Sequence, residues 1–106
     1  MVDKHTKDYK AGDVIVFDCQ GLSDILVKRV VGVPGDILRI EDGTLYINGV
    51  ASDEDKHFDY AGILEDSIEL AGNEYIVFGD NTSISRDSRY GNVGIVKSSD
   101  IIGEIM

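Results

Sequence analysis

The sequence predicts a mostly β domain of antiparallel strands with long loops, and three observations support this fold class. From residue 12 onward, short β-branched runs alternate with Gly and Asp turn signals at intervals typical of an all-β domain. The dipeptides Asp42-Gly43 and Asn48-Gly49 favour tight hairpins. Hydrophobic residues make up 42% of the 106 residues and charged residues 28%, an ordinary globular composition. We therefore expect one domain spanning residues 1–106.

The first strands come before the only proline of the chain. Residues 14–17 are apolar and mostly β-branched, which predicts a buried strand, and Gln20-Gly21 marks a turn. Residues 25–33 then predict a second, longer strand. The run Val33-Pro34-Gly35-Asp36 ends it, because proline donates no backbone hydrogen bond and glycine tolerates positive φ.

The middle of the chain predicts a meander. Residues 37–40 alternate into the turn at Asp42-Gly43, and residues 44–47 return toward the turn at Asn48-Gly49. The acidic segment 52–69 carries only scattered apolar residues, so we expect an exposed excursion with weak secondary structure.

The last third of the chain predicts the strands that complete the fold. Residues 74–78, in which Glu74 is followed by four apolar or aromatic residues, predict a strand, and a polar loop follows at residues 79–91. Residues 93–96 and 101–105 are expected to supply closing strands.

Composition excludes several kinds of partner. The formal charge of −10 would repel phosphate backbones and anionic lipid surfaces, so we expect no nucleic-acid partner. His5 and His57 lack ligands at zinc spacing, and Asp53-Glu54-Asp55 lacks the spacing of a calcium loop, so no metal or other cofactor is expected. The apolar runs are far shorter than the about 20 residues of a membrane-spanning helix.

Lys28 is the first residue that suggests chemistry. It lies in the predicted strand with Leu26 and Val27 before it and Val30 and Val31 beyond Arg29. Partial desolvation of the amine would disfavour its charged form, which is how a lysine becomes a general base near neutral pH. Taken alone, the context also fits a lysine that extends its ammonium into solvent from a strand face.

The loop of residues 79–91 is the second such feature. It packs hydroxyl, carboxylate and guanidinium groups between Gly79 and Gly91, a composition that favours a hydrogen-bond network. Such a network could orient a lysine amine and hold the adjacent backbone. By itself the loop could equally be a solvated polar turn.

Four segments together resemble the conserved boxes of bacterial type I signal peptidases, in the same order. They are Gly12-Asp13-Val14-Ile15-Val16-Phe17, Val27-Lys28-Arg29-Val30-Val31-Gly32-Val33-Pro34-Gly35-Asp36, Asp42-Gly43-Thr44-Leu45-Tyr46-Ile47-Asn48-Gly49, and Gly79-Asp80-Asn81 with Ser85-Arg86-Asp87-Ser88-Arg89. The resemblance implies a LexA/signal-peptidase-like β-domain from a serine protease that uses a Ser/Lys dyad to remove signal peptides at Ala-X-Ala-type sites.

The resemblance also implies roles for single residues. Lys28 would be the general base, and Ser85 would hydrogen-bond its amine and fix its direction. Asp87 and Arg89 match a supporting ion pair. Asp80 and Arg29 match a second pair that braces the loop against the lysine strand, although Thr82 replaces the arginine that usually follows Gly-Asp-Asn.

Substrate would lie extended and add to the lysine strand, with shallow apolar pockets selecting small side chains. Val16, Leu26 and Val27 match substrate-binding positions, although core packing alone would explain valine in a strand. The implied partners are signal peptides of exported preproteins. The parent enzyme would be anchored in the cell membrane by an N-terminal segment outside this sequence, with its catalytic domain on the extracytoplasmic face.

The 106 residues contain no Ser-Met-X-Pro motif, the family's nucleophile segment, because Pro34 is the only proline and it follows the lysine strand. We expect the chain to be inactive alone, either because it is shortened after that segment, which we favour, or because a paralogue lost its activity. A LexA-like self-cleaving domain and a non-enzymatic β-domain that binds extended peptides or a partner subunit are the alternatives.

Overall fold

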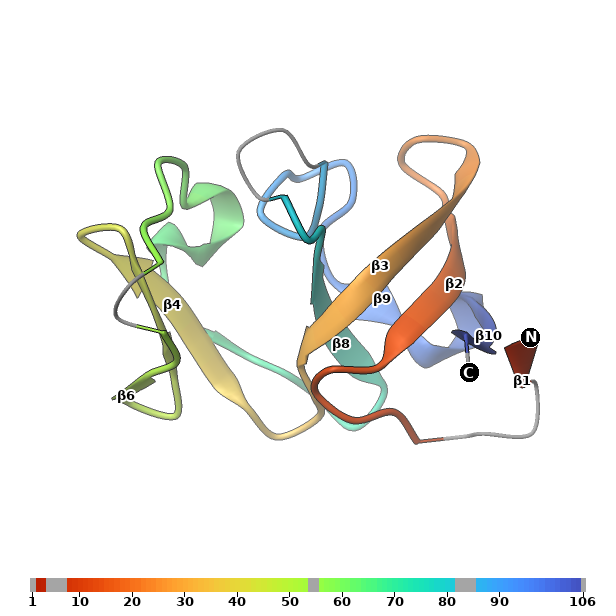
Figure 1. Ribbon diagram of the computed structural model, residues 1–106, viewed down its shortest axis with the longest axis horizontal. Helices are drawn as coiled ribbons and strands as arrows, with labels where there is room; N and C mark the ends of the chain where they lie inside the picture. Colours follow the sequence, from red (N-terminus) through yellow and green to blue (C-terminus); the bar gives the residue numbers. More distant parts are fainter. Residues whose placement is uncertain (1, 4–7, 54–55, 82–85, 106) are drawn as a thin grey trace.

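The computed structural model describes residues 2–3, 8–53, 56–81 and 86–105, and within them the fold is mostly antiparallel β-structure, as predicted (Figure 1). The strands are β1 Val2–Asp3, β2 Val14–Cys19, β3 Asp24–Gly32, β4 Ile37–Glu41, β5 Thr44–Ile47, β6 Val50–Ala51, β7 Ile68–Glu69, β8 Glu74–Phe78, β9 Val96–Lys97 and β10 Ile101–Ile105. Two 3-10 helices, η1 Gly62–Glu65 and η2 Ser98–Asp100, complete the described elements.

Six strands form one sheet in the order β1-β10-β2-β3-β8-β9, and every pairing is antiparallel. Its centre is the β2–β3 hairpin, in which Val14 lies opposite Arg29 and Cys19 opposite Asp24. Alternation along β2 buries Ile15, Phe17 and Cys19 on one face. The core face and the outer face of this sheet are therefore fixed by the two-residue period of a strand.

The other four strands form a second sheet in the order β6-β5-β4-β7, on the opposite side of β3 and β8 from β2 and β10 (Figure 1). Both turns of the predicted meander are present. Asp42 and Gly43 have φ angles of 51° and 79°, and Asn48 and Gly49 have φ angles of 55° and 83°. Positive φ at both central residues is the conformation that Asp-Gly and Asn-Gly favour.

Strand β8 joins two hydrophobic clusters because its buried side chains alternate between them. Tyr75 and Val77 belong to the first cluster, which packs on the six-stranded sheet, whereas Ile76 and Phe78 belong to the second. The first cluster also contains Tyr9, Ile15, Phe17, Cys19, Val30 and Val96. The second also contains Leu38, Ile40, Leu45, Phe58, Leu64 and Leu70. A strand that is buried on both faces has a continuous run of apolar residues, as residues 75–78 do.

Two expectations need correction. Residues 93–96 do not form a strand except at Val96, because Val93 and Gly94 both donate backbone hydrogen bonds to the carbonyl oxygen of Tyr90 in a turn, with Gly94 at φ 61°. The 52–69 segment is not simply an exposed excursion. Phe58 and Leu64 are 6% and 0% exposed and anchor it in the second cluster.

Candidate functional site

Lys28 lies on the core face of the six-stranded sheet. It is directly opposite Ile15, which is completely buried, and the two-residue period of β3 places Leu26 and Val30 on the same side. The lysine itself is only partly buried. The apolar surroundings predicted from the sequence are thus present, formed by both strands of the hairpin.

The strand that carries Lys28 has one edge with little pairing. Strand β2 pairs with β3 from Asp24 to Arg29, but β8 pairs with β3 only from Arg29 to Gly32. Along residues 24–28, no other strand within the described ranges pairs with the β8 side of β3. Such an edge presents backbone N–H and C=O groups to which an extended chain can add.

The outer face of the hairpin is apolar at the predicted substrate-binding valines. Val16 and Val27 lie directly opposite each other, and Val27 is 51% exposed. Ile25 lies two residues from Val27 and is 58% exposed. Leu26 lies on the other face, where it packs against the first cluster. The structure therefore brings Val16 and Val27 together and separates Leu26 from them.

A small pocket of about 100 Å³ lies beside Lys28. Its lining includes Val27 and Lys28 from β3, Val14 from β2, and the loop residues Gly79 and Asp80. Sequence reasoning did not select Val14 or Gly79. Val14 could have been found from the two-residue period of β2, because it is on the same face as Val16.

Arg29 joins three segments at this site. Its Nε donates to Asp80 Oδ1 at 3.0 Å, and its NH2 group donates to Asp80 Oδ2 at 3.3 Å. Its NH1 group donates to the carbonyl oxygen of Gly12 at 2.9 Å. The hydrogen bonds from Arg29, helped by charge attraction, lower the pKa of the Asp80 carboxyl, and the same contacts raise the pKa of Arg29. This pair joins the loop to the lysine strand and to Gly12.

Asp87 and Arg89 form the second pair, and it is buried. Arg89 donates from Nε to Asp87 Oδ1 at 2.9 Å and from NH2 to Oδ2 at 3.0 Å, with side chains 2% and 0% exposed. The guanidinium also donates to the carbonyl oxygen of Tyr60 and lies 5.6 Å from the ring centres of Phe58 and Phe78. Arg89 therefore ties the loop to Tyr60 and to the second hydrophobic cluster.

Ser88, between these two residues, was not selected from the sequence. Its Oγ accepts a hydrogen bond from the backbone N–H of Val77 at 2.8 Å, and its own N–H donates to the carbonyl oxygen of Val77 at 3.0 Å. The loop is thereby fixed to β8. A buried serine next to an ion pair has no sequence signal of its own, because its partner is a backbone group. Ser85, the predicted partner of the lysine, lies outside the described residues.

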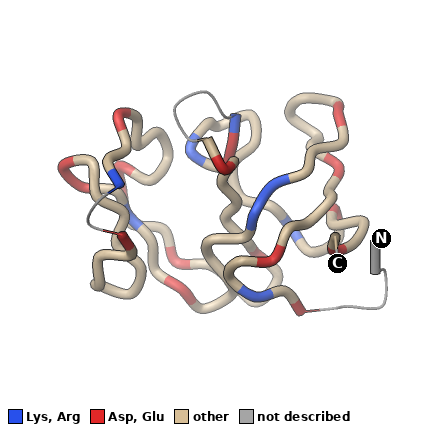
Figure 2. The backbone as a smooth tube through the Cα atoms, in the orientation of Figure 1, with Lys and Arg blue, Asp and Glu red and all other residues tan. Residues whose placement is uncertain are grey.

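Strand β3 carries two adjacent basic residues, Lys28 and Arg29, in a chain whose net charge is negative. In Figure 2 the Lys and Arg positions of β3 form one blue segment, whereas acidic positions occur in both sheets. Within the described ranges, no group of three or more His, Cys, Asp or Glu side chains is arranged to hold a metal ion. No helix among these residues has the length and apolar character needed to cross a membrane.

A family model and individual relatives of known identity both match this chain, and both indicate the same family. The family described as "Signal peptidase, peptidase S26" matches residues 1–106. "Signal peptidase I P" of Bacillus subtilis subsp. natto is 33% identical over 94% of this chain, and "Signal peptidase IB" of Staphylococcus aureus strain COL is 32% identical over 99% of it. The chain spans 59% and 63% of the lengths of these two relatives.

The fold agrees with a solved structure. The crystal structure of a signal peptidase I from Enterococcus faecalis V583 superposes with a TM-score of 0.75 and 27% sequence identity, covering 100% of both chains. The antiparallel β-architecture described above is therefore similar to that of a signal peptidase I.

Proposed function

This chain belongs to the signal peptidase family of S26 peptidases, and from that premise we propose that Lys28 is the general base of a serine endopeptidase that removes signal peptides from exported preproteins. The observation that carries the proposal is the position of Lys28. It lies on β3 beyond the pairing with β8, which extends from Arg29 to Gly32, and it lines a small pocket of about 100 Å³. Strand β3 therefore carries the proposed base, the backbone edge at residues 24–28 and part of the lining of the small pocket.

The proposed chemistry needs a neutral amine at Lys28. Ile15 opposite it and Leu26 and Val30 on the same face surround the aliphatic stem with apolar groups. The amine would take the proton of a serine hydroxyl as the oxygen attacks the scissile carbonyl, and then return a proton to the leaving amine. Water would hydrolyse the resulting acyl-enzyme with the same lysine as base.

Substrate binding is proposed to occur by strand addition. The edge of β3 at residues 24–28 offers main-chain hydrogen bonds, and alternate side chains of an extended peptide would point toward the face that carries Val16 and Val27. A pocket of about 100 Å³ beside Val27 accepts only a small side chain. Small residues at alternate positions are the Ala-X-Ala pattern.

The two ion pairs are proposed as positioning groups. Arg29 and Asp80 hold the loop against β3, while Asp87 and Arg89 hold the far end of the same loop against Tyr60. Ser85 belongs to the loop between them and is proposed to orient the lysine amine. None of the five touches the scissile bond in this mechanism.

We propose that no serine of these 106 residues is the nucleophile. The sequence lacks the Ser-Met-X-Pro motif, and Ser88, the serine nearest the ion pairs, is completely buried with its Oγ bonded to Val77. The nucleophile would come from a segment outside this sequence. The complete enzyme is proposed to be anchored in the cell membrane with this domain on the extracytoplasmic face.

The test is cleavage of a fluorogenic Ala-X-Ala peptide by the chain, with and without a fused segment that carries Ser-Met-X-Pro. We expect no cleavage without the segment and cleavage with it. Lys28→Ala should abolish that activity, whereas Lys10→Ala, an exposed lysine outside the site, should not change it. Lysine-dependent cleavage by the unfused chain would overturn the assignment of the nucleophile.

A binding function without cleavage uses the same edge of β3. An extended peptide could add to residues 24–28 whether or not a nucleophile is present. In that case Ala-X-Ala peptides would bind the unfused chain and the fused chain equally, and neither would cleave them.

A further inference from the structure

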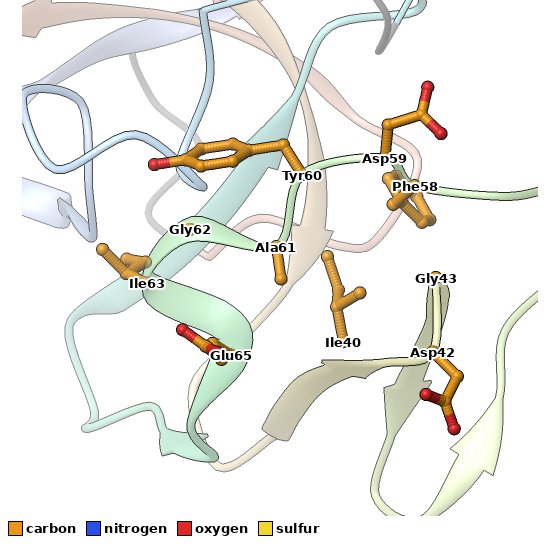
Figure 3. A pocket seen from close by; sticks show the side chains of 10 residues that line it. All are labelled: Ile40, Asp42, Gly43, Phe58, Asp59, Tyr60, Ala61, Gly62, Ile63 and Glu65. Atoms are coloured by element: carbon orange, nitrogen blue, oxygen red, sulfur yellow. The ribbon is translucent and has the colours of Figure 1, made fainter.

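The pocket of about 560 Å³ between the β4–β5 turn and residues 58–65 offers no set of converging polar groups (Figure 3). The carboxyl groups of Asp42 and Asp59 point away from the apolar side chains of Ile40 and Ala61. The N-terminal end of β3 is different, because one carboxylate there bonds to the backbone edge where substrate is proposed to add. This carboxylate belongs to Asp24, the first residue of the strand.

The backbone groups of β3 alternate between its two sides, because successive residues of an antiparallel strand bond to opposite neighbours. The N–H of Val30 donates to the carbonyl oxygen of Asp13 at 2.7 Å, so Val30 bonds on the side of β2. The pairing of β2 with β3 is regular from Arg29 back to the first residue of β3, so the even-numbered residues share this direction. The N–H and C=O groups of Ile25 and Val27 therefore point to the opposite side, which is the proposed substrate edge.

The carboxylate of Asp24 occupies one of these edge groups. Its Oδ1 accepts a hydrogen bond from the N–H of Ile25 at 2.8 Å, a contact that we call the Asp24 cap. Both residues are exposed, Ile25 by 58%. Among the described residues Asp24 forms no salt bridge, so another acceptor can replace its carboxylate without breaking an ion pair. Charged side chains at the end of an edge are one way in which proteins limit strand addition.

We propose that Asp24 is a positioning residue that competes with substrate for the N–H of Ile25 and so sets how far an extended peptide pairs along β3. The inference rests on the strand addition proposed above. A peptide that pairs at Val27 leaves the cap in place, whereas one that continues to Ile25 must replace the carboxylate with a carbonyl oxygen. A carboxylate accepts a stronger hydrogen bond than a neutral carbonyl does.

The cap therefore concentrates substrate recognition near the proposed base. The peptide segment opposite Ile25 contributes little to affinity, because each hydrogen bond that it gains costs the bond to Asp24. Pairing at Val27 carries no such cost from Asp24, and Val27 and Lys28 line the small pocket. The substrates that this edge favours are those whose small side chain fits the pocket, with little selection of the residues that lie farther along β3.

Amide hydrogen exchange tests the cap without any substrate. Asp24→Ala removes the acceptor, so the N–H of Ile25 should exchange about fivefold faster, the effect of one hydrogen bond of about average strength. Asp24→Asn keeps an oxygen acceptor without the charge and should give a smaller increase. Asp18→Ala is the matched control, because Asp18 is exposed and lies directly opposite Ile25 on β2. It should leave the exchange of Ile25 within about twofold of the unchanged chain.

Peptide binding tests the competition. A labelled Ala-X-Ala peptide long enough to span residues 24–28 is titrated by fluorescence anisotropy, and Asp24→Ala should lower its Kd about fivefold. Asp18→Ala should stay within about twofold of the unchanged chain. Peptides shortened at one end or the other identify the end that reaches Ile25, because one of the two should lose the gain. In the chain fused to the Ser-Met-X-Pro segment, Asp24→Ala should lower KM more than it changes kcat.

Four results would overturn the inference. Faster exchange at Ile25 with unchanged affinity in Asp24→Ala would reject the competition and leave strand addition intact. Equal gains in Asp24→Ala and Asp18→Ala would assign the effect to overall charge. Unchanged exchange at Ile25 in Asp24→Ala would show that the cap is absent in solution. If no variant binds peptide up to about 1 mM, strand addition itself is wrong and the inference fails with the proposed function.

Discussion

The two arginine–carboxylate pairs of the loop have nearly the same geometry and very different surroundings. Arg29 contacts both oxygens of Asp80 at 3.0 and 3.3 Å, and Arg89 contacts both oxygens of Asp87 at 2.9 and 3.0 Å. The first pair is 45% and 77% exposed, whereas the second is 2% and 0% exposed. Similar hydrogen-bond lengths therefore do not imply similar contributions to stability.

The difference follows from what remains when one partner is removed. An exposed carboxylate that loses its arginine is solvated by water, so the loss is small. A buried carboxylate that loses its arginine stays uncompensated in a region of low dielectric constant. We infer that Asp87–Arg89 holds the loop against Tyr60 and the second hydrophobic cluster, while Arg29–Asp80 mainly sets the position of the loop beside Lys28.

The largest effect is expected when the buried pair is broken. Arg89→Met leaves Asp87 without its cation and should lower the free energy of unfolding by about 3–5 kcal/mol. Urea unfolding followed by circular dichroism measures it. The double variant Asp87→Leu with Arg89→Met should recover part of the loss, and a double variant less stable than Arg89→Met would contradict this account.

A substitution in the backbone beside the buried pair should have the next largest effect on the free energy of unfolding. Gly62 has a φ of 57°, and a Cβ there would lie 1.9 Å from the carbonyl oxygen of Arg89. Gly62→Ala should therefore cost about 3 kcal/mol through backbone strain and steric overlap. Gly49→Ala is the control, because Gly49 has a φ of 83° but nothing near its Cβ position, and about 1 kcal/mol is expected. Equal losses would exclude the steric contribution.

Substitution of Ser88 tests whether its hydrogen bonds to Val77 hold the loop against β8. Ser88→Ala leaves the buried backbone N–H of Val77 without the Oγ acceptor and should cost about 1–3 kcal/mol. The exposed Ser99→Ala is the comparison, for which thermal unfolding should show almost no change. A Ser88→Ala variant as stable as Ser99→Ala would mean that the loop is held without this hydrogen bond.

Breaking the exposed pair should change the free energy of unfolding least, and the size of this change should depend on pH. The pKa of Asp80 is lowered in the folded chain by Arg29, so its contribution is present above the ordinary carboxyl pKa, about 3.9, and is lost as pH falls through the lower folded value. Asp80→Asn should therefore be slightly less stable than the unchanged chain at pH 7, with the difference disappearing below pH 4 and in high salt. A loss as large as that of Arg89→Met would break the comparison.

Local chemistry accounts for what the sequence predicted well. The hairpin turns at Asp42-Gly43 and Asn48-Gly49 depend on positive φ at two adjacent residues, a property of those residues themselves. The strand at residues 74–78 was predicted because its residues 75–78, which are buried on both faces, are apolar or aromatic. Residues 93–96 were misassigned because β-branched residues also occur in turns when backbone hydrogen bonds, here to Tyr90, are available.

Within the candidate site, the resemblance selected Arg29, Asp80, Asp87 and Arg89, and the structure joins them in the implied pairs. It could not show that Leu26 faces the core, nor that Val14 lines the small pocket. Those properties depend on strand register. The roles of Lys28 and Ser85 stay predictions that the cleavage assay tests.

By itself the sequence determined the antiparallel β-fold and its tight turns, because these depend on short-range patterns, and its motifs selected the four residues of the two ion pairs. Only the tertiary structure decided that one ion pair is buried and the other exposed, and that β8 pairs with β3 only from Arg29 to Gly32. Arg29 and Asp80 are 51 residues apart in the chain. Burial and pairing at that separation depend on how the two sheets meet at β8, which no local pattern specifies.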